Sequence, residues 1–325
     1  DALKGQKILF CCFYDYTINQ GEKETVYAKY ILEPLSAGGT CFKNAVEYFG
    51  IQVDLVKHYE DAIAKLTNKN KDGKCEYYAV WFMSSNYLQL PLPENGSQYY
   101  PDQFIDCVIK FWKNGGSVVA LCDNDPFTFL VNLFLERIEF PEIGKTNLRV
   151  HGFHQGRTHL KADPTGKLDQ PGTFNSSPIE FEKGRRAPLS HNLVDIYEGV
   201  TISYAPDDQQ QYAPFIPFMR DSQGGISSLY YQGDSDIDNV VGDIVIDCGF
   251  TKLFEEITES GTARYLQNIA AWTAQCESKI QRGIRPDLFH PDAVEFNFDS
   301  SKKYEDASQL FVPLDPAEIY GCQIY

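Results

Sequence analysis

The stretch that decides the fold reads Asn114-Gly115-Gly116-Ser117-Val118-Val119-Ala120-Leu121-Cys122-Asp123-Asn124-Asp125-Pro126. The glycine pair ends a helix, and the apolar run 117–121 is typical of a central parallel strand. Beyond the strand, Asp123 or Asp125 can cap a new helix, and Pro126 suits its first turn. A cysteine between such a strand and such a helix occupies the position where α/β hydrolytic enzymes carry a nucleophile. Cys122 is therefore the first candidate for chemistry.

Strand and helix signals alternate on both sides of this stretch. Apolar runs predict further strands at 7–14, 51–56, 78–83 and 242–249. Apolar residues at helical spacing predict helices at 39–49, 61–66, 102–112, 127–140 and 262–278. Strands that alternate with helices predict an α/β fold, built on a doubly wound, mostly parallel sheet with right-handed crossovers.

Two segments depart from this alternation. Residues 147–232 are rich in Gly, Pro, Ser and Thr and hold short β-type runs at 148–153, 201–204 and 225–231, which predicts a β-rich insertion against the sheet. Residues 284–325 hold four prolines, three basic and eight acidic side chains, and no helical periodicity. We therefore divide the chain into an α/β domain at 1–282 and an extended acidic tail at 283–325. Apolar anchors in the tail indicate contact with a protein partner.

The bulk composition excludes several classes of protein. The 325 residues include 45 acidic and 29 basic side chains, and a net charge of −16 disfavours binding to nucleic acid or to an anionic membrane surface. No run of 18 apolar residues is present, so no membrane insertion is expected. Nine cysteines without a CxxC pair argue against a zinc knuckle or a disulfide framework. Such cysteine usage favours a reducing, intracellular compartment, and we expect a cytoplasmic protein.

In an open parallel sheet, ligands bind at the carboxyl ends of the strands, near the point where the strand order reverses. The candidate ligand-binding residues at these expected ends are Asp15, Ser84, Ser85, Asn86, Asp123, Asn124 and Thr251. Helix N-termini at the same edge favour anions and lower the pKa of a thiol, whereas the aspartates around Cys122 oppose this effect. The electrostatics of the expected crevice are therefore mixed.

Taken together, these patterns resemble the class I glutamine amidotransferase-like superfamily over about residues 5–280. The segment 120–124 falls on the Gly-x-Cys-x-Gly elbow of that family, matching its cysteine but neither glycine. Ser190-His191-Asn192-Leu193, followed by Gly199-Val200, resembles the His-x-Leu and Gly-Val segment, and 261–272 resembles the closing helix. The resemblance implies a flavodoxin-like fold.

One part of the family pattern is missing. The family places a His-x-Glu pair just after a late strand, where this chain reads Asp247-Cys248-Gly249-Phe250-Thr251-Lys252, without a histidine. A cysteine nucleophile needs a base or a strongly lowered pKa. Our first interpretation is therefore a catalytically silent amidotransferase-like domain, which serves binding or assembly in a larger intracellular protein and uses no cofactor.

Two alternatives stay open. The chain can be a cysteine-dependent hydrolase or amidotransferase-like enzyme acting on C–N bonds, with Cys122 as nucleophile and His154 or His191 as base. Backbone N–H groups near Ser85 and Asp123 would then form its oxyanion hole. It can also be a small-ligand receptor that uses the strand-end crevice without chemistry. No metal site is expected, since the acidic run 234–239 lacks the central glycine and closing glutamate of an EF-hand.

Overall fold

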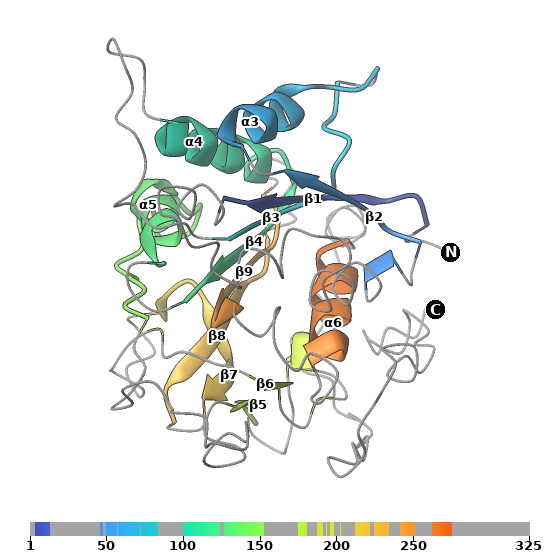
Figure 1. Ribbon diagram of the computed structural model, residues 1–325. Coiled ribbons are helices and arrows are strands. Elements are labelled where there is room, and N and C mark those ends of the chain that lie inside the picture. Colours follow the sequence, from blue (N-terminus) through green and yellow to red (C-terminus); the bar gives the residue numbers. More distant parts are fainter. Residues whose placement is uncertain are drawn as a thin grey trace, which may run out of the picture.

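A computed structural model gives the arrangement of the chain (Figure 1). It describes residues 4–13, 46–47, 50–56, 58–71, 73–83, 100–123, 127–152, 175–180, 187–190, 193, 196–197, 202, 212–221, 224–233, 241–250 and 262–274. The expected acidic tail at 283–325 lies outside these residues.

Parallel strands make up one half of the sheet. They are β1 (Lys7–Cys12), β2 (Gln52–Val56), β3 (Ala79–Met83), β4 (Ser117–Cys122) and β9 (Ile244–Cys248). Their order is β2-β1-β3-β4-β9, and each neighbouring pair is parallel. The order reverses between β1 and β3, as in flavodoxin-like sheets. The predicted α/β fold with a flavodoxin-like parallel sheet is confirmed.

An antiparallel extension continues the sheet beyond β9. It consists of β8 (Ile226–Tyr231), β7 (Ile216–Asp221), β5 (Asn175–Pro178) and β6 (Ile196–Tyr197). Every neighbouring pair in this part is antiparallel. Because β8 pairs with β9, the two parts form one nine-stranded sheet within the described residues. All four strands come from the segment 147–232, which confirms the expected β-rich insertion.

Helices cover both faces of the parallel half (Figure 1). One face carries α3 (Tyr59–Thr67), α4 (Tyr100–Trp112) and α5 (Phe129–Arg137), and the other carries α6 (Thr262–Ala274). Successive residues of β4 pack into two separate hydrophobic cores. Val118, Ala120 and Cys122 face α3–α5, whereas Val119 and Leu121 face α6. This alternation follows from the period of two along a strand, and it makes the sheet doubly wound as predicted.

The glycine pair after α4 has the role that the sequence suggests. Gly115 takes a left-handed φ of 89°, which terminates the helix, and the N–H groups of Gly115 and Gly242 both donate to the Trp112 carbonyl. The Trp112 indole N–H in turn donates to the Gly242 carbonyl at 2.6 Å. A Cβ on Gly242 would lie 1.9 Å from the Gly116 carbonyl oxygen. The end of α4 and the entries to β4 and β9 therefore meet at one close backbone contact.

The capping prediction for the helix after Cys122 is wrong. The helix α5 begins at Phe129, and Thr128 occupies its N-cap position without a side-chain hydrogen bond. Asp123 is instead buried at the strand end, and its backbone N–H donates to the Phe127 carbonyl at 3.3 Å. The helix α5 therefore begins two residues later than the predicted 127.

The insertion differs in detail from the expectation. Residues 148–152 form no strand because both backbone groups of Val150 bond to the side-chain amide of Asn132 on α5, at 2.8 Å each. The strand β7 lies outside the runs predicted as strands, and it contains Pro217, a residue type that is unusual inside a sheet. In the structure a register irregularity against β8 lies between Pro217 and Met219, and such bulges tolerate proline.

Within the described parts of the chain, none of the helices combines the length and apolar character needed to cross a bilayer.

Candidate functional site

Cys122 is the last residue of β4 and lies beside Cys248, the last residue of β9. The two cysteines are partners in the parallel register, and their side chains face the α3–α5 core. Both side chains are 0% exposed, and both cysteines are free thiols. An open nucleophile position would instead present its sulfur to solvent at the strand end.

The thiols are held by backbone groups across the two strands. Cys122 Sγ donates to the Asp247 carbonyl at 3.3 Å, and Cys248 Sγ approaches the Asp123 carbonyl at 3.9 Å. Burial raises the pKa of Cys248 well above its usual value, and the neighbouring Cys122 thiol adds to this effect. The Cys248 thiol is thus protonated at neutral pH, and the pair resembles core packing more than an activated nucleophile.

Two aromatic side chains pack just beyond β4 and β9, on the α6 side of the sheet and not on the side of the thiols. The rings of Phe127 and Phe250 pack edge to face, with 5.8 Å between their centroids. Phe250 is buried, and the adjacent Gly249 N–H donates to the Cys122 carbonyl at 2.7 Å. Asp123 is only 2% exposed. Asp123 after β4 and Phe250 after β9 are therefore both buried within the protein.

A buried acid lies on the opposite face of β9, toward α6. Asp247 Oδ2 accepts hydrogen bonds from Tyr265 Oη at 2.5 Å and from Ser228 Oγ at 2.8 Å, and the two hydroxyls lie 3.0 Å apart. All three residues are almost completely buried. Burial, followed by the Asp247 carboxylate, holds the pKa of Tyr265 well above its usual range. A buried carboxylate is costly unless donors surround it, so this network fixes α6 to β8 and β9.

No local sequence pattern predicts this network. A signal was present, because Asp247 follows the apolar residues 244–246 in a strand that is buried on both faces. An acid inside such a run requires donors from neighbouring elements. Ser228 and Tyr265, however, are separated from it in sequence, and neither residue type is unusual in a strand or a helix.

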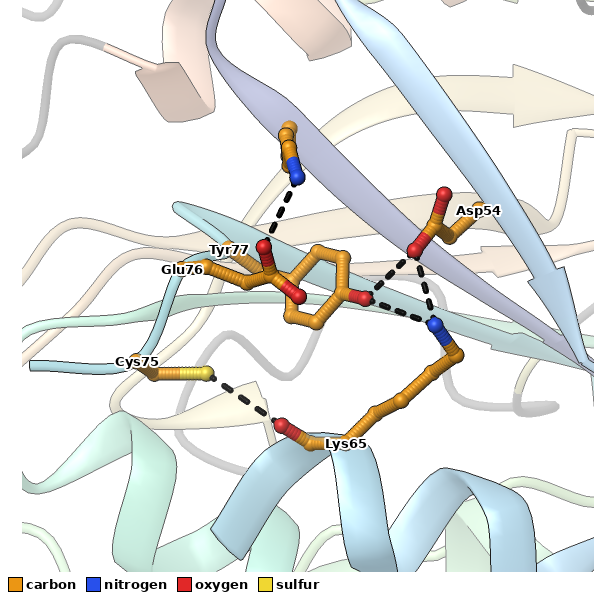
Figure 2. Close-up of polar contacts among 6 residues, drawn as sticks. Asp54, Lys65, Cys75, Glu76 and Tyr77 are labelled. Carbon is orange, nitrogen blue, oxygen red and sulfur yellow. Dashed lines mark hydrogen bonds and ion pairs between the residues drawn. The ribbon is translucent and has the colours of Figure 1, made fainter. Parts of the chain in front are cut away.

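A second polar cluster joins β2, α3 and the residues that precede β3 (Figure 2). Asp54 Oδ2 accepts from Tyr77 Oη at 2.6 Å and from Lys65 Nζ at 2.8 Å. These two bonds, with that from Lys65 the stronger, lower the pKa of Asp54. Burial and the Asp54 carboxylate raise the pKa of Tyr77. The bond between Lys65 and Asp54 links α3 to the edge strand β2. Both side chains are more than a third exposed to solvent.

Of the predicted site residues, the structure describes Cys122 and Asp123 and brings them together at the end of β4. The other predicted catalytic and ligand-binding residues lie outside the described residues, and their roles stay predictions. They are His154, His191, Asp15, Ser84, Ser85, Asn86, Asn124 and Thr251. Among the described residues, no three His, Cys, Asp or Glu side chains are grouped so that they could hold a metal ion.

Comparisons with known proteins give only distant likenesses. No protein-family model matches the chain, and no curated protein matches it. The cytoplasmic protein STM1381 from Salmonella typhimurium LT2 is 12% identical, with a TM-score of 0.45 over 82% of this chain and 99% of that chain. The mmIFT52 N-terminal domain is 10% identical, with a TM-score of 0.41 over 82% and 97%. The Salmonella typhimurium cytoplasmic protein STM3548 is 10% identical, with a TM-score of 0.39 over 82% and 98%.

Proposed function

We propose that this chain is a non-catalytic, amidotransferase-like α/β domain that serves binding or assembly in a larger intracellular protein. The observation that carries the proposal is the state of Cys122. Its sulfur is wholly buried, donates to the Asp247 carbonyl and lies beside a second thiol. A nucleophile in this position would need access to substrate and a base that removes its proton.

The surroundings of Cys122 also support binding elsewhere on the domain. Phe250, two residues after β9, is buried and packs edge to face against Phe127 on the α6 side of the sheet. Asp247, whose backbone carbonyl accepts from the Cys122 thiol, points its carboxyl group to the opposite face, where Tyr265 and Ser228 engage it. We therefore assign the binding role to the outer surface and to the acidic tail at 283–325, with a protein as partner.

The first experiment measures the reactivity of Cys122. The native chain is treated with iodoacetamide at neutral pH, and each cysteine is followed by peptide mass spectrometry. We expect Cys122 to react at least about a hundredfold more slowly than in concentrated urea, since labelling requires opening of the core. The half-buried Cys107 gives an internal reference for an accessible thiol in the same molecule. Faster labelling of native Cys122 than of the denatured thiol would overturn the proposal.

A second experiment tests catalysis directly. Ammonia release from glutamine is measured for the unmodified chain and for Cys122→Ala. We expect both proteins to match the buffer blank. Release by the unmodified chain that is lost in Cys122→Ala would instead identify a cysteine-dependent enzyme.

A further inference from the structure

A cavity of about 570 Å³ lies at the amino ends of the parallel strands, at the opposite end of the sheet from Cys122. It opens between the C-terminal ends of α3, α4 and α6. Its apolar wall includes the buried side chains of Leu66, Tyr77 and Phe111 and the half-buried thiols of Cys75 and Cys107. This volume is within the range of small-molecule sites in proteins.

Helix C-termini normally favour a cation, because their last carbonyls are unsatisfied. Here the carbonyls of the last turn of α4 are used within the chain. Those of residues 109–112 accept from the Asn114 side-chain amide and from backbone N–H groups at 113–116 and 242. On α3, the Lys65 carbonyl accepts from Cys75 Sγ, and on α6 the Thr273 carbonyl accepts from Ser117 Oγ at 3.0 Å. The end of α4 therefore creates little demand for a cationic ligand, and one carbonyl near each of the other two helix ends is also satisfied.

The charged side chains around the cavity favour an anion. Lys69, Lys74 and Lys110 line it, in a chain whose net charge is −16. Among the described lining residues, Glu76 alone carries a carboxylate, and it is paired with Lys7 at 2.7 Å. Within the described parts of the chain, the ammonium groups of Lys69 and Lys110 form no ion pair. The cavity thus combines an apolar interior with a basic rim.

We propose that this cavity binds a small organic anion with an apolar body. The body would contact Tyr77 and Phe111, and the anionic head would lie at the ammonium groups of Lys69 and Lys110. This site lies beyond the proposed function, because it uses neither Cys122 nor the acidic tail.

The probe is 8-anilinonaphthalene-1-sulfonate, which joins an aromatic body to a sulfonate and fluoresces when bound. We expect saturable binding to the native chain, weakened about tenfold by Lys69→Glu with Lys110→Glu, since two attractions become repulsions. The matched control is Lys113→Glu with Lys145→Glu, which makes the same change in net charge at exposed lysines outside the cavity lining. This control should leave the affinity within about twofold, and near-ultraviolet circular dichroism checks that each variant is folded.

Two further measurements separate the site from general dye adsorption. Octanoate should displace the dye, whereas octylammonium, with the same chain and the opposite charge, should not. The bound dye should also slow alkylation of Cys107 by N-ethylmaleimide without changing that of Cys122. Absence of saturable binding, equal weakening in both double variants, or unchanged Cys107 labelling would each overturn the proposal. These measurements do not depend on the reactivity of Cys122. The anion-binding proposal can therefore be rejected without rejecting the proposed non-catalytic function, and the reverse also holds.

Discussion

Tyr265 of α6 donates its phenolic hydrogen to the carboxylate of Asp247 on β9, with 2.5 Å between the two oxygens. Both side chains are buried, and Ser228 of β8 donates to the same carboxylate oxygen. The contact joins the last helix to the strand at which the parallel and antiparallel halves of the sheet meet. Loss of this contact should therefore lower the stability of the fold.

Tyr265→Phe should lower the free energy of unfolding by about 2 kcal/mol, because a buried carboxylate loses a charge-assisted hydrogen bond. Urea unfolding followed by circular dichroism measures the change. A double-mutant cycle with Asp247→Asn should give a coupling energy above about 0.5 kcal/mol. Additive effects of the two substitutions would show that the pair contributes nothing as a unit.

The Asp54 cluster should behave differently because it is half-exposed. Tyr77→Phe and Asp54→Asn should each cost less than about 1 kcal/mol at pH 7. The pKa of Asp54 is lowered in the folded chain, so its contribution is present above the unfolded value of 3.8 and is lost as pH falls through the folded pKa. The stability difference between the unmodified chain and Asp54→Asn should consequently shrink in acid. A difference that grows below pH 4 would contradict this assignment.

Alkaline pH should destabilise the fold through its buried thiols. Burial raises the pKa of both Cys11 and Cys248 well above 9.0, so above that pH the folded state holds more protons than the unfolded state. Stability must then fall as pH rises, by at most about 1.4 kcal/mol per pH unit for each thiol. Urea unfolding between pH 7 and pH 10.5 measures the slope. Cys11→Ala should flatten it, and a slope unchanged by this substitution would exclude the thiol as its source.

Gly242→Ala should prevent stable folding or cost more than about 3 kcal/mol, because its Cβ would meet the backbone oxygen of Gly116 at 1.9 Å. The matched control is Gly144→Ala. Gly144 has a left-handed φ of 73° with open space around its Cβ position, so that substitution should cost about 1 kcal/mol. Similar losses in the two variants would indicate that the sheet can shift to admit the methyl group.

Deletion of residues 283–325 should leave cooperative thermal unfolding in place, because the described sheet and helices are contained in residues 4–274. Differential scanning calorimetry of the shortened chain tests the predicted domain boundary. Loss of the cooperative transition would place the boundary further along the chain.

The parallel half could be predicted from the sequence because each element carries its own local signal. The run 117–121 reads as a buried strand, and Phe104, Val108 and Phe111 stand at helical spacing on the buried side of α4. Local patterns could not reveal β7, where Pro217 argues against a strand that a bulge accommodates. They also could not reveal that the segment after Leu148 is held by Asn132 and not by a neighbouring strand.

The candidate site was harder to predict for the same reason. The sequence placed Cys122 at the end of a strand, which the structure confirms. It could not show that Cys122 lies beside Cys248, which is far away in the chain and adjacent in space. The network of Asp247, Ser228 and Tyr265 likewise forms only when three separate elements pack together. A pattern read along one segment contains no information on such partners.

The pairing of β4 with β9 also governs the order in which this protein can assemble. Val118 of β4 aligns with Ile244 of β9. One side of β4 therefore stays unpaired until a strand more than a hundred residues later in the chain has been synthesised. On the ribosome, the amino-terminal part would expose an apolar, unpaired edge until β9 emerged. Because β9 itself follows the whole antiparallel extension, translation pauses or truncation before residue 244 should yield aggregates instead of a smaller native domain.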